Sequence, residues 1–163
     1  MASLLENAPA EVTKLGRELI TGHYPELDDA NVTIGYLFAR PAQTTRGQVI
    51  AGKVKKTSVE QRLKGLPDCL IIIDGDGWDQ WTEEKRRGLL DHELYHIEVC
   101  KDNAGQIKYD EAERPKLRMK NHDFEIVGFT EIIERNGEHA IETQELAKWG
   151  KKFEAVTQKC FWG

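Results

Sequence analysis

The sequence predicts an α+β fold in which a short, mostly antiparallel sheet packs against several helices. Apolar residues recur at helical spacing in several segments, whereas others carry the alternating or continuous β-branched runs typical of strands. The chain has 163 residues, of which 39% are hydrophobic, enough to build one core but too little for two comfortable ones. We therefore expect a single domain over residues 1–163.

The first half of the chain predicts one helix followed by strands. Apolar residues at helical spacing place an amphipathic helix over residues 9–23. The segments 32–39 and 48–55 are predicted strands, and the polar connection between them suggests that they form a hairpin. The continuous apolar run at 69–74 predicts a buried strand that leads into a loop at 75–81.

The second half is mostly helical. Thr82 is the expected N-cap of a helix that runs to about Val99, because two glutamates follow it where the helix dipole favours negative charge. Turn residues in 101–120 predict an irregular excursion or a hairpin. Further helices are expected over 122–135 and 139–160, and no internal repeat is visible.

Composition narrows the class of protein. The formal net charge of -5 and the pI near 5.6 argue against a strongly basic nucleic-acid binder. Three cysteines without CxxC spacing indicate neither a disulfide framework nor a cysteine zinc knuckle, which favours a reducing compartment. No signal peptide or membrane span is recognisable, so the expected location is the cytoplasm, without a membrane partner.

The segment HELYH, residues 92–96, carries the clearest chemistry. On a helix, His92 and His96 project from one face and can reach a single metal ion at roughly 2.0 to 2.1 Å. Glu93 is badly placed to join them as a ligand, but it can accept a proton from a water that the metal activates. Apolar neighbours predict a buried helix, in which Tyr95 points away from the histidines and belongs to the core.

A catalytic zinc site needs a third protein ligand. His122, in the segment NHDFE, is the preferred candidate because imidazole is a common zinc ligand and this residue opens the next predicted helix. Glu125, one turn further on, is the alternative third ligand or an acceptor that orients His122. His23 and His139 have no comparable context and are read as surface or packing residues.

These motifs carry a family resemblance. The segment GWDQWTEEKRRGLLDHELYH, followed by a charged stretch and then by NHDFE and IIERNG, resembles the putative phage metallopeptidase family, related to the SprT-like zincins. The resemblance covers roughly Leu66 to Gly137 and leaves the C-terminal helix outside the familiar pattern. It implies a zincin-like α+β domain of phage or prophage origin, with zinc bound by His92, His96 and His122 and with Glu93 as the catalytic acid/base.

The leading hypothesis for function is zinc-dependent hydrolysis of a peptide bond, with a protein or peptide as substrate and a host factor among the candidates. Glu93 would act as general base and then deliver the proton to the leaving amine. The strand expected at 48–55 could offer its edge to an extended peptide. If the chain is encoded by a phage, its compartment is the host bacterial cytoplasm.

The alternative is a catalytically silent, zinc-stabilised phage protein that binds a host protein or DNA. Its support is a cluster of lysines and arginines that could contact phosphates, although runs of charged residues usually form solvated faces. The members of this cluster are Lys53, Lys55, Lys56, Arg40, Arg46, Arg62 and Lys64, joined in the wider version by Arg114, Lys116, Arg118 and Lys120. The sequence indicates neither the substrate nor the oligomeric state.

Overall fold

The computed structural model describes residues 2–123 and 128–162, with side chains as far as Glu154. The chain divides into two compact units, Met1–Asn121 and His122–Gly163, which we describe separately. The first unit holds helices and sheets together and so confirms the predicted α+β class.

The main sheet has four strands in the order β1-β2-β6-β5. β2 and β6 run parallel, whereas the two outer pairs are antiparallel, as expected for a mostly antiparallel sheet. The strands are β1 (Leu4–Asn7), β2 (Ile34–Arg40), β6 (Cys69–Asp74) and β5 (Gly52–Lys56).

The predicted hairpin between 32–39 and 48–55 is wrong, because β6 lies between β2 and β5. Five of the six residues of β6 are buried, so this strand is stable only with neighbours on both edges, and it takes an inner position. The predicted strand 48–55 is also divided. Its start, β4 (Gln48–Val49), pairs instead with β3 (Thr44–Thr45) in a small separate hairpin.

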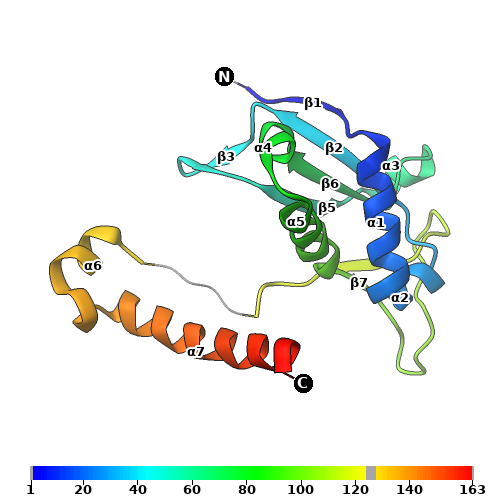
Figure 1. Cartoon of the computed structure of the whole chain (residues 1–163). Coiled ribbons are helices and arrows are strands. Elements are labelled where there is room, and N and C mark those ends of the chain that lie inside the picture. Colours follow the sequence, from blue (N-terminus) through cyan, green and yellow to red (C-terminus); the bar gives the residue numbers. More distant parts are fainter. Residues whose placement is uncertain (1, 124–127, 163) are drawn as a thin grey trace. The chain divides into compact units, whose positions relative to one another are not determined.

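Two long helices cover one face of the sheet (Figure 1). α1 (Ala10–His23) confirms the first predicted helix, and it packs beside α5 (Glu83–Tyr95). Shorter helices are α2 (Pro25–Asp29), α3 (Val59–Leu63) and α4 (Gly75–Gln80). The core between helices and sheet is built from Val12, Leu19, Phe38, Ile71, Ile73, Trp78, Leu90 and Leu94.

The segment 75–81, predicted as a loop, is mostly the helix α4. The Asp74 side chain accepts a hydrogen bond from the Gly77 N–H at 2.9 Å and so caps this helix. Its two glycines weaken the helical signal in the sequence, and the burial of Trp78 against Phe38 compensates for them. The tertiary contact therefore decides the local structure here.

The helix α5 begins as predicted, with the Thr82 side chain accepting from the Lys85 N–H at 3.3 Å. It ends at Tyr95 and not at Val99, because the next three residues form strand β7 (Ile97–Val99). Ile97 and Val99 are both buried with a half-buried glutamate between them, the alternation of a strand. β7 pairs antiparallel with β8 (Leu117–Met119), which confirms a hairpin in the predicted excursion.

The connection between these two strands contains a repeat that the sequence analysis missed. The segments DNAGQIKY (102–109) and DEAERPKL (110–117) make the same turn eight residues apart. In each, the aspartate carboxylate accepts hydrogen bonds from the N–H groups two and four residues later, at 2.8 to 3.2 Å. The fourth residue of each turn is left-handed, Gly105 at φ 79° and Glu113 at φ 58°.

A ring of three backbone hydrogen bonds closes this connection, which we call the double-turn arm (residues 100–116). Lys108 N–H donates to the Cys100 carbonyl at 3.0 Å, Lys116 N–H to the Lys108 carbonyl at 2.8 Å, and Cys100 N–H to the Lys116 carbonyl at 2.9 Å. The arm is therefore held in one conformation by its own backbone hydrogen bonds.

The second unit is helical. It contains α6 (Thr130–Asn136), a 3-10 turn (Gly137–His139) and α7 (Ile141–Trp162), the last of which confirms the predicted C-terminal helix. Of the helix expected over 122–135, the described residues show α6 from Thr130 onward, whereas His122 and Asp123 are not helical and Phe129 is extended. Residues 124–127 lie outside the described residues.

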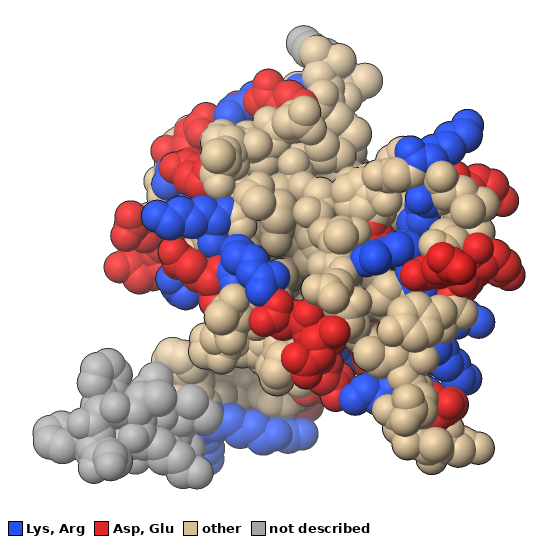
Figure 2. Space-filling model, turned by 90° about the vertical axis from the view of Figure 1, so that its right-hand side faces the viewer, with Lys and Arg blue, Asp and Glu red and all other residues tan. Residues whose placement is uncertain are grey.

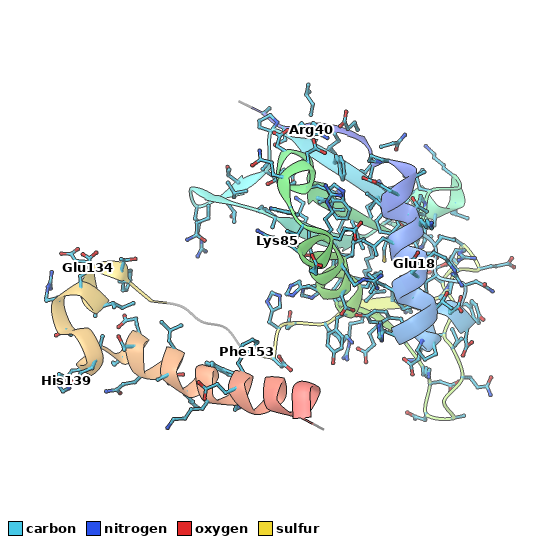
Figure 3. The ribbon with its side chains drawn as sticks, in the orientation of Figure 1. Glu18, Arg40, Lys85, Glu134, His139 and Phe153 are labelled. Carbon is cyan, nitrogen blue, oxygen red and sulfur yellow. The ribbon has the colours of Figure 1, made fainter. Side chains whose placement is uncertain are left out.

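Charges of both signs are intermingled on the face shown in Figure 2, where neither sign forms a continuous field. An example is Arg40, which Figure 3 places at one end of the sheet. Its guanidinium donates to Glu6 at 2.7 Å, to Asp76 at 2.9 Å and to Asp79 at 2.8 Å. Among the helices described, none combines the length and apolar character needed to cross a bilayer.

Candidate metal centre

Three histidines converge at the end of the helix α5. His92, His96 and His122 each offer one ring nitrogen, and these nitrogens all lie within 4.8 Å of one another. The first two come from the last turn and C-cap of α5, where the four-residue spacing brings their rings together edge to face with centroids 5.1 Å apart. The third is the first residue of the second unit, directly after the return of the β7–β8 hairpin.

The hairpin explains how His122 reaches the other two. β7 leaves α5 immediately after His96, and β8 returns in register with it, Ile97 opposite Met119. Beyond that pair the ladder continues, because Lys120 N–H donates to the His96 carbonyl at 2.6 Å. A residue two positions after Lys120 must therefore lie near His96, whatever the length of the arm between the strands.

Lys120 also sets the orientation of the His96 ring. Its carbonyl oxygen lies 2.6 Å from His96 Nδ1. Because a carbonyl can only accept, Nδ1 carries the proton and Nε2 is left with a lone pair. Metal-binding histidines commonly have this arrangement, in which a backbone carbonyl fixes the tautomer and turns the free nitrogen toward the ion.

Glu93 follows His92 in α5 and is buried, with 4% of its surface exposed. Burial raises the pKa of this carboxyl, and the charge of the neighbouring His96 opposes the rise. A carboxylate with a raised pKa is a stronger proton acceptor than one in water. The structure therefore gives the motif an acid/base group with little contact to solvent.

Gly52 in strand β5, which no motif in the sequence marks as functional, lies directly against Glu93. A Cβ at Gly52 would lie 3.1 Å from Glu93 Oε1 and 3.1 Å from Leu89 Cδ1. Glycine is needed here for space, since the backbone of Gly52 is not left-handed. Its absence of a side chain lets the sheet and the carboxylate lie in direct contact.

We expect Gly52→Ala to displace the Glu93 carboxylate by a few tenths of an ångström while folding persists, a shift that would lower turnover about tenfold in an enzyme that uses Glu93 as its base. The measurement is kcat together with zinc content and thermal melting. Gly22→Ala, where a Cβ would meet nothing within 4 Å, is the matched control. Unchanged turnover in both variants would show that the contact with Gly52 does not hold Glu93 in place.

The sequence model of a family described as putative phage metallopeptidase matches residues 4–154. The chain belongs to this family. The match is wider than the segment 66–137 that carried the resemblance in the sequence, and it includes the sheet and much of α7. No curated protein and no solved structure matches the chain.

A metallopeptidase family implies a metal ion, and the residues present fit one. Three imidazoles from the described residues can converge on one ion, and at least one of them has its proton held away from it. This donor set suits zinc and also other first-row metals, because imidazole binds several of them. Glu125, the alternative third ligand, lies outside the described residues.

Tyr95 departs from the expectation that it would belong to the core, since it is 62% exposed. The ammonium of Lys120 lies 3.8 Å from the centroid of its ring. His92 is exposed as well, so α5 is buried on one face only and not all round.

The basic residues that the sequence suggested as a cluster are distributed over several elements of the first unit. Lys53 and Lys55 lie on one face of strand β5 and Lys56 lies on the other, because successive residues of a strand point to opposite faces. The Lys56 ammonium donates to the Leu117 carbonyl at 3.3 Å. Most arginines of the cluster are committed to carboxylates: Arg40 to Glu6, Asp76 and Asp79, Arg62 to Asp110, Arg114 to Asp68 and Arg118 to Glu98. These pairs reduce the charge available to a phosphate backbone.

Proposed function

We propose that the protein is a zinc-dependent metallopeptidase in which Glu93 is the general base. The observation that carries this proposal is the convergence of His92, His96 and His122 within 4.8 Å, together with the buried carboxylate of Glu93, the residue that follows His92 in α5. Membership of the metallopeptidase family supports it independently of the geometry. Three protein ligands are the number that leaves a coordination position for water or substrate.

Each residue then has a defined task. The histidines hold the ion, and zinc in such a site acts as a Lewis acid that lowers the pKa of a coordinated water to about 7. Glu93 accepts a proton at its carboxylate and returns it to the amine that leaves. Lys120 keeps the His96 ring in its binding tautomer through the 2.6 Å contact with Nδ1.

Strand β5 supports a peptide as substrate. It is the end strand of the main sheet, and its Gly52 contacts the general base. A peptide that adds to this edge as an extended strand would pass beside Glu93 with its backbone hydrogen-bonded to the sheet. We infer a protein or peptide substrate, such as a host factor in the bacterial cytoplasm if the chain acts there.

Metal removal tests the proposal. We expect the full chain to cleave members of an unbiased peptide library, to lose this activity on treatment with a chelator, and to recover it on addition of one equivalent of Zn²⁺. Cleavage sites are identified by mass spectrometry, and bound metal by elemental analysis. Stoichiometric zinc without cleavage of any peptide or unfolded protein would favour the alternative, a silent zinc-stabilised binding protein.

A further inference from the structure

The double-turn arm spans most of the chain between the second and third histidines, and an ion pair with the buried Asp68, the residue before β6, is one of its attachments to the rest of the first unit. Arg114, in the second turn, donates from Nε to Asp68 Oδ1 at 3.0 Å and from Nη2 to Asp68 Oδ2 at 2.8 Å. Arg114 Nη2 also donates to the Asn31 carbonyl at 2.6 Å. This is the bidentate geometry in which an arginine fixes both the position and the angle of its partner.

Asp68 is anchored firmly on the other side. It is 1% exposed, and it accepts from the Thr33 N–H at 2.8 Å and from the Thr33 hydroxyl at 3.0 Å. Burial alone would raise the pKa of this carboxyl, but the hydrogen bonds from Arg114 and Thr33 outweigh it and hold the pKa below its usual range. Asp68 is therefore a charged acceptor built into the start of β6.

The same turn has a second attachment. Asp110, whose carboxylate organises the turn, accepts from Arg62 Nε at 2.8 Å. Both side chains of this pair are almost fully buried, with 10% and 4% exposure. The first turn of the arm, with the same internal hydrogen bonds, is exposed throughout its five residues 102–106. The ion pairs therefore attach the second turn of the arm and not the first. The second turn leads into β8, the strand that precedes His122.

We propose that Arg114 is a positioning residue for the metal site, which fixes the place of His122 by tying the arm and β8 to Asp68. This inference rests on the metal site of the proposed function, and it adds a residue that is not a ligand. Arg114 lies three residues before β8 begins and eight before His122. Loosening the turn lets β8 shift along β7, and such a shift moves His122 away from His92 and His96.

The test compares zinc affinity in two variants that make the same charge change in the same hairpin. Arg114→Gln removes the attachment to the sheet, whereas Arg118→Gln removes only the pair with Glu98 on the neighbouring strand. We expect Arg114→Gln to weaken zinc binding about tenfold or more, in the range known for partners behind metal ligands, and Arg118→Gln to change it less than about twofold. Affinity is measured by competition with a zinc chelator.

Arg114→Gln leaves the buried Asp68 without its cation, so the double variant Asp68→Asn/Arg114→Gln serves where the single variant does not fold. A merely structural role lowers the melting temperature of the metal-free protein but leaves the zinc-induced rise in melting temperature unchanged. A positioning role reduces that rise. The visible spectrum of bound Co²⁺ provides a second readout, because it changes with the geometry of the ligands.

Wild-type zinc affinity in folded Arg114→Gln and in the double variant would overturn the proposal and leave the proposed function standing. Equal weakening in Arg114→Gln and Arg118→Gln would overturn it too, because the effect would then come from charge alone. Failure of peptide cleavage with zinc affinity behaving as expected would overturn the proposed function only. Absence of zinc binding by the wild type would overturn both.

Discussion

Glu93→Gln is expected to lower kcat for peptide cleavage by about 10³-fold with zinc still bound at one equivalent, since general-base catalysis contributes about 10²- to 10⁴-fold. The amide has nearly the shape of the carboxylate but cannot accept the proton. The loss falls on turnover because Glu93 does not belong to the set of three histidines that we propose as the ligands. KM is expected to change little, since the amide occupies the same buried space against Gly52.

Glu98→Gln is the matched control for this variant. Glu98 lies five residues further on, in β7, and accepts from Arg118 Nε at 2.7 Å. Glu98→Gln makes the same change of charge as Glu93→Gln, and we expect it to keep wild-type turnover. Steady-state kinetics and elemental analysis on both proteins decide the matter. Turnover retained by zinc-loaded Glu93→Gln would remove this glutamate from the reaction and leave the base unassigned.

His122→Ala is expected to reduce zinc affinity by more than about 100-fold, because loss of a ligand should exceed the 10- to 100-fold cost of losing a partner behind one. The two histidines of α5 remain and keep weak binding of the ion. Folding of the first unit should persist, since His122 is exposed and follows its last residue. Chelator competition and thermal melting without metal measure the two quantities separately.

His139→Ala gives the comparison for His122→Ala. His139 also belongs to the second unit, and its side chain is 84% exposed beside Glu138. It has no place in the cluster of ring nitrogens, so zinc affinity should match the wild type. Equal affinity in His122→Ala would mean that another residue supplies the third ligand, with Glu125 the first candidate to mutate.

The parts of the fold that the sequence predicted are those decided by local pattern. The apolar spacing in 9–23 gave α1, and the run CLIIID gave β6. Pairing of strands depends on contacts far apart in the sequence, and the expected hairpin was wrong because β6 inserted between its two strands. The end of α5 was misplaced because Ile97 and Val99 fit either a helix or a strand.

The candidate site divides in the same way. HELYH predicted two of the three converging histidines because their spacing is set by one helix turn, and NHDFE predicted the third by its chemistry. His122 was expected at the start of a helix, but a strand and not a helix brings it to the site. The contacts of Gly52, Lys120 and Arg114 described above had no signal in the sequence, which marked the two basic residues only as candidate phosphate contacts, since space, a backbone carbonyl and a distant ion pair have no fixed spacing.

The double-turn arm has a consequence for the thermodynamics of metal binding. The 25 residues from Ile97 to Asn121 separate two of the three histidines. Bringing together the ends of a flexible loop of that length costs about 3 kcal/mol of chain entropy. Here the pairing of β7 with β8 closes the loop during folding, so the entropy cost is part of the free energy of folding and not of metal binding. The free energy of metal binding therefore does not include this loop-closure cost, a difference that corresponds to a factor of about 100 in affinity.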